Sequence, residues 1–424
     1  MPNLTINPRP KSFSSFTKEI EHDYTGRRIN PQRPKMPNCS LIKMNNRKYL
    51  TLMVLGTILA LTPSGNLHAN RKSSDPGPRP TALKGWKTNT AKRTIDLNEL
   101  ISGGPGKDGI PAINKPKFVK PDKAENWLKP VEPVISLVVN DKAKAYPLQI
   151  LMWHEIVNDR IGGVPVAVSF CPLCYSANVF DRRIKDKVYT FGVSGMLRHS
   201  DMVMYDRQTQ SLWQQFNGQA IVGDMVGTTL KRIPAQIISF EQFRNIYKNG
   251  LVLSRDTGYR RKYGRNPYVG YDDINNKPHL YRGKQDPRLK PMEKLITVNI
   301  NNTGKAYPYS ITRKKRAIND EVGGQKIVIF HDRGAASAMD KAEIALSRED
   351  GSTGVFSRQL ADRLLTFSRK GDTFVDDQTS SIWDITGRAI KGELKGKKLS
   401  PVVHGDYFAF AWLVFKPETK IYNE

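Results

Sequence analysis

The sequence predicts an α+β protein of mainly antiparallel β-strands, in which two pseudo-symmetric, duplicated halves share one core. Three observations support this fold class. A long block of sequence recurs later in the chain, strand-like runs are short and bounded by turn residues, and only two short stretches favour helix.

The duplication rests first on residues 128–163, LKPVEPVISLVVNDKAKAYPLQILMWHEIVNDRIGG. They match residues 289–324, LKPMEKLITVNINNTGKAYPYSITRKKRAINDEVGG, without a gap, and 15 of the 36 positions are identical. A second block, 206–234, recurs at 376–402. Two long blocks in the same order indicate a duplicated unit and not a short solenoid repeat. The predicted parts are a first half over 115–253, a connector over 254–282 and a second half over 283–424.

The strand-like runs are rich in Val, Tyr, Phe and Trp and are bounded by Asn-Asp, Gly-Gly, Asp-Arg and Lys-Asp turns. In the first half they are VISLVV (134–139), VPVAVSF (164–170), VYTFGV (188–193) and SLWQQF (211–216). SFEQFRNIYKN (239–249) is the clearest helix candidate, and AYPLQILMW (145–153) favours one helical turn.

The N-terminal region predicts export. Residues 1–43 are polar, Pro-rich and basic, so we expect a disordered basic extension upstream of a secretory signal that begins at Met44; a start codon assigned too early is the alternative explanation. Met44–Ala69 has a positive start and an apolar run over 49–61 that is short for a membrane span, which is typical of a signal peptide. The alternative is an uncleaved N-terminal anchor, because the cleavage box is weak. Residues 70–114 are predicted to be a linker, and the body to be periplasmic or secreted.

The net positive charge of the chain does not point to a specific binding partner. There are 67 Lys and Arg against 40 Asp and Glu, a net charge of +27, and a charge of +20 remains after residue 69. No run of five basic residues and no nucleic-acid motif accompanies it, so we expect no nucleic-acid partner but a loose attraction to anionic envelope surfaces. P-loop and Cys-x-x-Cys-His patterns are absent from the sequence.

The most informative motif is FCPLC, which contains Cys171 and Cys174; the third cysteine, Cys39, precedes the predicted signal. One interpretation is a thiol redox pair in which Cys171 attacks and Cys174 resolves. A second is a metal site, and a third is a structural disulfide, although so small a loop gives modest stabilisation. The electron donor or small-molecule substrate cannot be named from the sequence.

A comparison of the two halves indicates that the cysteines and His154 serve a function and are not required for packing of the fold. Where the first half has FCPLC, the second has FHDRG at nearly the same register, and Lys315 replaces His154. Scaffold residues such as Tyr, Pro, Asn and Gly recur, whereas the reactive types do not. We therefore predict Cys171, Cys174 and His154 as catalytic residues, with His154 as acid–base group, although a histidine beside Trp153 is also typical of a core.

Further along the chain, SGMLRHSDMVMYDRQT places Arg198, His199 and Asp201 between apolar runs. They are predicted to bind substrate, with Arg198 stabilising a thiolate or a substrate carboxylate; a surface loop is the alternative. In the metal interpretation the ligands are Cys171, Cys174, His154 and His199, a Cys₂His₂ set suited to zinc, copper or iron.

Several of these stretches resemble the domain-of-unknown-function family 3179, whose members are exported proteins of bacteria and archaea. The resemblance covers about residues 105–424 and rests on AYPLQILMWHEIVNDRIGGVPVAVSFCPLCYSANVFDRR, FGVSGMLRHSDMVMYDRQTQSLW, LSRDTGYRRKYGRNPY and GRAIKGELKGKKLSPVVHGDYFAFAWLVFKPETKIY. It implies no particular activity. Some relatives are described as selenoproteins with selenocysteine at a cysteine of this motif, which implies redox chemistry there.

Overall fold

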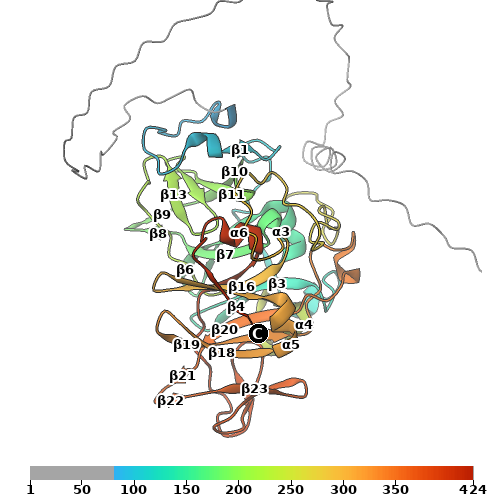
Figure 1. Cartoon of the computed structure of the whole chain (residues 1–424). Coiled ribbons are helices and arrows are strands. Elements are labelled where there is room, and N and C mark those ends of the chain that lie inside the picture. Colours follow the sequence, from blue (N-terminus) through green and yellow to red (C-terminus); the bar gives the residue numbers. More distant parts are fainter. Residues whose placement is uncertain (1–80, 424) are drawn as a thin grey trace, which may run out of the picture.

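The computed structural model describes residues 81–423, which form a stack of small β-sheets with a few short helices (Figure 1). Antiparallel pairing dominates, so the predicted α+β, mainly antiparallel fold class is confirmed. The predicted extension (1–43), the predicted signal peptide (Met44–Ala69) and residues 70–80 of the predicted linker lie outside the described residues. Within 81–423, no helix is both long enough and apolar enough to span a bilayer.

The strands up to the end of the first half are β1 (Ile101–Ser102), β2 (Phe118–Val119), β3 (Pro133–Val139), β4 (Lys142–Pro147), β5 (Ile156–Ile161), β6 (Val164–Cys171), β7 (Ser176–Asp181), β8 (Arg183–Ile184), β9 (Lys187–Val188), β10 (Phe191–Arg198), β11 (Asp201–Asp206), β12 (Leu212–Gln214), β13 (Gln219–Val222), β14 (Gln236–Ser239) and β15 (Leu251–Leu253). They form sheets in the orders β14-β3-β4-β15-β2, β5-β6-β7 and β1-β10-β11-β12-β13, plus the β8-β9 hairpin.

The strands of the second half are β16 (Lys294–Ile300), β17 (Thr303–Pro308), β18 (Ala317–Val322), β19 (Gln325–Asp332), β20 (Ser352–Ser357), β21 (Gln359–Leu360), β22 (Arg363–Leu364), β23 (Phe367–Lys370), β24 (Thr373–Asp376), β25 (Ile382–Trp383), β26 (Ala389–Lys391), β27 (His404–Phe408) and β28 (Lys420–Ile421). Their sheets are β27-β16-β17-β28, β18-β19-β20 and β23-β24-β25-β26, plus the β21-β22 hairpin.

The α-helices are short: α2 (Pro121–Ala124), α3 (Leu148–His154), α4 (Phe240–Ile246), α5 (Tyr309–Lys315) and α6 (Ala409–Leu413). Single 3-10 turns are η1 (Thr81–Leu83), η2 (Leu97–Glu99), η3 (Pro172–Cys174) and η4 (Ile344–Leu346). The predicted helix at 239–249 is α4. It begins at a capping box in which the Ser239 side chain and Gln242 satisfy each other's backbone N–H groups, and it buries Phe240 and Phe243.

The elements of the two halves follow the same order. β3 and β16 begin at Pro133 and Lys294, 161 residues apart, and the next four elements keep this offset. Both halves also contain the same buried contact, in which a tryptophan Nε1–H donates to an aspartate Oδ2 at 2.9 Å, from Trp213 to Asp206 and from Trp383 to Asp376. The recurrence concerns order and length; an origin by duplication stays a prediction.

The two halves bury side chains together. One hydrophobic cluster joins Val134 and Phe240 of the first half with Phe330 and Trp383 of the second. In another, Phe408 of the second half packs within the large cluster of the first. Burial of apolar area in common clusters therefore holds the halves to each other.

Residues 81–114 lie in the predicted linker, yet they belong to the folded body. Leu83, Trp86 and Leu100 are buried against Tyr205, and β1 pairs with β10. The sequence pattern misses this because these apolar residues are widely spaced among Gly, Pro and Lys and show no helical or strand period.

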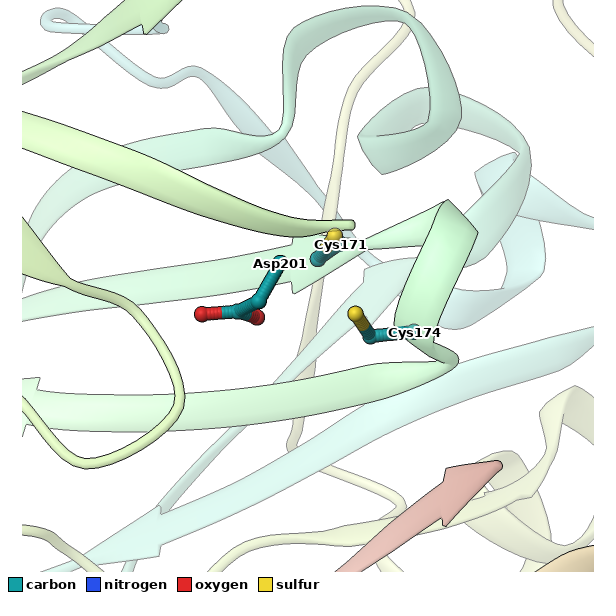
Figure 2. Close-up of side chains that lie close together, drawn as sticks. All are labelled: Cys171, Cys174 and Asp201. Atoms are coloured by element: carbon teal, nitrogen blue, oxygen red, sulfur yellow. The ribbon is translucent and has the colours of Figure 1, made fainter. Parts of the chain in front are cut away.

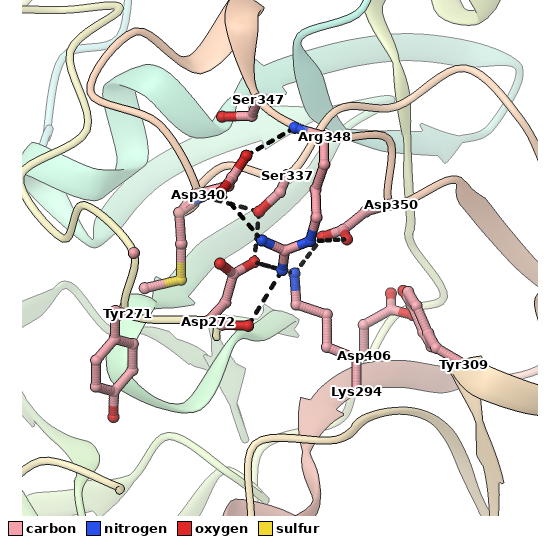
Figure 3. Close-up of polar contacts among 12 residues, drawn as sticks. Tyr271, Asp272, Lys294, Tyr309, Ser337, Asp340, Ser347, Arg348, Asp350 and Asp406 are labelled. Atoms are coloured by element: carbon pink, nitrogen blue, oxygen red, sulfur yellow. Dashed lines mark hydrogen bonds and ion pairs between the residues drawn. The ribbon is translucent and has the colours of Figure 1, made fainter. Parts of the chain in front are cut away.

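A buried ion network joins the connector to the second half (Figure 3). Lys294 Nζ lies 2.8 Å from Asp272 Oδ2 and also pairs with Asp350, while Arg348 Nη2 lies 2.6 Å from Asp272 Oδ2. The same ammonium lies 4.0 Å from the ring centroid of Tyr175, the residue that follows Cys174. Because the Lys294 side chain is only 5% exposed, its charge depends on these partners.

Replacing Lys294 by Met is expected to lower the free energy of unfolding by about 3 kcal/mol, since two buried carboxylates lose a partner. Urea denaturation measures the change. The matched control is Lys398→Met, because Lys398 pairs with Asp141 at an exposed position, where loss costs about 1 kcal/mol or less. Equal effects of the two variants would contradict the network's role.

Asp272 makes stability depend on acid pH. Burial alone pushes its pKa up, but Lys294 and Arg348 outweigh burial and lower the pKa to about 2. Because the folded pKa lies below the unfolded value of 3.8, the carboxylate's contribution is complete above about pH 4 and is lost as the pH falls through about 2. The stability difference between wild type and Asp272→Asn should therefore shrink over this window; a constant difference would refute the assignment.

Candidate functional site

The two cysteines occupy the connection between β6 and β7. Cys171 ends β6, Pro172 starts the 3-10 turn η3, and Cys174 ends it. Tyr175 then adopts a left-handed conformation, with φ of 55°, which turns the chain into β7. The motif therefore closes the hairpin of β6 and β7, and it is followed by a strand and not by a helix.

Asp201 joins the two thiols in one buried group (Figure 2). The Sγ atoms of Cys171 and Cys174 and a carboxylate oxygen of Asp201 lie within 4.8 Å of one another, and each residue is 1% exposed. Asp201 begins β11, directly after the tight turn of the β10–β11 hairpin. The hairpin thus carries its carboxylate to the end of β6.

The carboxylate of Asp201 is held on one side only. Its Oδ2 accepts the backbone N–H of Phe216 at 3.0 Å and a hydrogen bond from the Gln214 side-chain amide. Its Oδ1 has no hydrogen-bond partner among residues 81–423, and a carboxylate oxygen lies within 4.8 Å of both sulfur atoms. The second oxygen is therefore available to the thiols.

Burial disfavours the charged forms of the two thiols and of the carboxyl groups beside them. It raises the pKa of Cys171, and it raises the pKa of Cys174 well above the usual thiol range. It also raises the pKa of Asp201 to about 7 and that of the neighbouring Glu155 to about 8. The Cys174 thiol and the Met202 backbone N–H both donate to the sulfur of Cys171, which stabilises its thiolate more than that of Cys174.

His154 lies outside this group. Its Nδ1 is 2.7 Å from the carbonyl oxygen of Pro111, so Nδ1 carries the proton, and its Nε2 accepts from the hydroxyl of Tyr263 at 2.6 Å. Burial lowers the pKa of His154 to about 4, so the ring is neutral at pH 7. With both nitrogens engaged, this histidine is placed to hold Tyr263.

Arg198 and His199 bind a carboxylate on the protein itself. Both contact Glu99 Oε2, Arg198 Nη2 at 2.8 Å and His199 Nε2 at 3.1 Å. Arg198 also donates to Gln214, whose amide holds Asp201.

Of the site residues predicted from the sequence, the structure brings together Cys171, Cys174 and Asp201. Within residues 81–423, neither His154 nor His199 belongs to a group with metal-ligand spacing.

The connector covers the motif. The hydroxyl of Tyr271 donates to the carbonyl oxygen of Leu173 at 3.1 Å, and Ser200 Oγ donates to the carbonyl oxygen of His279 at 2.6 Å. Sequence reasoning missed Tyr263 and Tyr271 as site neighbours. The only available signal was the unusual Tyr and Arg content of the connector, because its path across the first half depends on tertiary packing.

The second half lacks this arrangement. Strand register places Asp332, not His331, at the position of Cys171, and Arg316 occupies the position of Glu155. Arg316 and Asp332 form an ion pair. The hairpin also differs, because β10 has 8 residues and its counterpart β23 has 4, so the extension that carries Asp201 is absent.

Cys171 and Cys174 should resist alkylation while the protein is folded, because both are buried and both have raised pKa values. Iodoacetamide at pH 7.5 is expected to label these two residues after denaturation at least about tenfold faster than before it. Mass spectrometry of their peptide gives the labelled fraction, and reduced glutathione added to the same sample reports on reagent activity. Rapid labelling of the folded chain would contradict the buried site.

Comparison with known proteins gives a family but no activity. The family profile described as "Protein of unknown function (DUF3179)" matches residues 107–419. No curated protein and no solved structure matches the chain. The match spans both halves, the connector and the buried thiols, and confirms the resemblance seen in the sequence. The chain belongs to the DUF3179 family.

Proposed function

We propose that Cys171 and Cys174 form a dithiol–disulfide redox site in an exported protein, with Asp201 as the proton acceptor of Cys174. The observation that carries the proposal is the buried carboxyl group of Asp201, which lies within 4.8 Å of the Cys174 sulfur and whose pKa burial raises to about 7. A base with a pKa near the working pH transfers protons most effectively. Its partner thiol, with the higher pKa, is the one that needs such help.

The roles of the two thiols follow from their surroundings. Cys171 receives hydrogen bonds from Cys174 and Met202, so its thiolate forms more readily and it attacks first. Cys174 then resolves the intermediate. This order agrees with the order predicted from the sequence.

The electron acceptor in this proposal is an organic disulfide. Cys171 loses its proton, its sulfur attacks one sulfur of the disulfide, and the first thiol leaves with a proton. Cys174 then gives its proton to Asp201 and attacks Cys171 Sγ, and the second thiol leaves with the proton from Asp201. The protein pair loses two electrons and becomes a disulfide, while the acceptor is reduced to two thiols.

Access to the thiols requires movement of the connector. Each cysteine is 1% exposed, and Tyr271 and His279 contact the motif and the adjoining hairpin turn. We include in the proposal that this segment is displaced when a disulfide reaches Cys171. The exported location is likewise part of the proposal, and the pattern of Met44–Ala69 supports it.

A metal site is the second candidate, because two thiols and a carboxylate converge within 4.8 Å. The ligands would be Cys171, Cys174 and Asp201, in place of the Cys₂His₂ set expected from the sequence. A bound zinc, copper or iron ion would deprotonate both thiols and thereby offset the cost of burying their charge. The donor chemistry fits such an ion.

The test of the redox proposal is the variant Asp201→Asn, which keeps a hydrogen-bond acceptor but removes the base. Formation of the Cys171–Cys174 disulfide with oxidised glutathione at pH 8 should slow by about a hundredfold. The wild-type rate should also rise through pH 7 as Asp201 ionises, and this rise should vanish in the variant. Quenched samples analysed by mass spectrometry give the rates.

The control is Asp224→Asn, because Asp224 is an exposed carboxylate that pairs with Asn89 and Lys92. It should react as the wild type does. An unchanged rate in Asp201→Asn would overturn the role of Asp201. A stoichiometric metal that blocks disulfide formation, and that is lost in Cys171→Ser, would instead support the second candidate.

A further inference from the structure

A cavity of about 660 Å³ lies beside β1 and β10, on a part of the chain that the redox proposal does not use. Its basic lining residues are Lys84, Lys107 and Arg282, and no acidic residue lines it. Its size is typical of pockets for small organic ligands, which occupy roughly 300–1,000 Å³. Its three cations come from segments far apart in sequence, so the fold gathers positive charge at this place.

None of these cations forms an ion pair with a carboxylate among residues 81–423, although acidic residues lie nearby in sequence and the charge of Asp108 acts on Lys107 from beyond ion-pair distance. Asp108 is held by Arg207 at 2.8 Å, and Glu99 is held by Arg198 at 2.8 Å. Lys107 Nζ instead lies over the rings of Trp86 and Tyr205, 4.5 Å and 4.7 Å from their centroids. Ring faces orient an ammonium without neutralising it, so the charge remains available to an anion.

The backbone around the cavity is specifically shaped. β10 has a bulge between Val193 and Met196, and Gly195 within it has a φ of +75°. A Cβ atom there would lie 2.0 Å from the carbonyl oxygen of Pro105, so only glycine permits this close approach of strand and loop. Bulges of this kind often lie beside binding sites, because they redirect the strand.

We propose that this cavity binds a small organic anion through a phosphate or carboxylate group held by Lys84, Lys107 and Arg282. Lysine and arginine donate charge-assisted hydrogen bonds to both groups. Ser102 and Asn98 also line the cavity and offer neutral polar groups to the rest of such a ligand. The inference does not depend on the thiol chemistry, because Cys171, Cys174 and Asp201 do not line the cavity.

Isothermal titration calorimetry of the full chain at 0.15 M salt tests the proposal, with glucose 6-phosphate and citrate as probes and glucose as the uncharged control. At least one anion is expected to bind with one-to-one stoichiometry, and glucose is not. Arg282→Gln and Lys84→Gln should each weaken binding about tenfold, since each removes one charged hydrogen bond. Both side chains belong to exposed residues, so folding is retained.

The matched control is Lys395→Gln, which removes one charge from an exposed position in the second half. It should bind as the wild type does. Absence of binding by both anions would overturn the proposal. An equal loss in Lys395→Gln would also overturn it, because the attraction would then come from the overall charge of +27.

Discussion

Burial of ionisable side chains constrains this molecule more than any other interaction, because a charge removed from water must be paired or neutralised. Both solutions occur close to Tyr175, which follows Cys174 in the chain and whose ring contacts Lys294. In the first, Lys294 is paired with Asp272 and Asp350. In the second, the acids at the Cys-Pro-Leu-Cys turn have no cation in direct contact, and burial raises their pKa values. The first arrangement holds the connector to the second half, and the second creates a reactive group.

The comparison between the halves locates the chemistry within the scaffold. Equivalent strands, helices and Trp–Asp contacts recur, so the common framework does not require thiols. At the position of Glu155 and Cys171, the second half has the ion pair of Arg316 and Asp332. Two opposite charges compensate each other when they are removed from water, but an ion pair cannot exchange electrons. The longer β10–β11 hairpin adds the carboxylate only in the first half.

The sequence predicted the strands, the helix α4 and the family, because periodicity, turn residues and the internal repeat are local or directly countable. The roles of the two cysteines stay predictions. The sequence named Asp201, but as a substrate-binding residue, since its distance to Cys174 depends on the pairing of β10 with β11. The expected grouping of His154 with the thiols was not found, because α3 directs its ring to Pro111 and Tyr263. The covering role of Tyr271 had no sequence signal, since a long irregular connector is positioned only by tertiary contacts.

The central claim is that the buried pair cycles between dithiol and disulfide. Equilibration of the purified chain in dithiothreitol buffers of graded potential, with the Cys171–Cys174 peptide and bound metal quantified in the same samples, tests it most directly. The account predicts one reversible two-electron transition with substoichiometric metal. A peptide that stays reduced at every potential, or stays oxidised at every potential, would contradict it and leave a metal holder or a structural disulfide respectively.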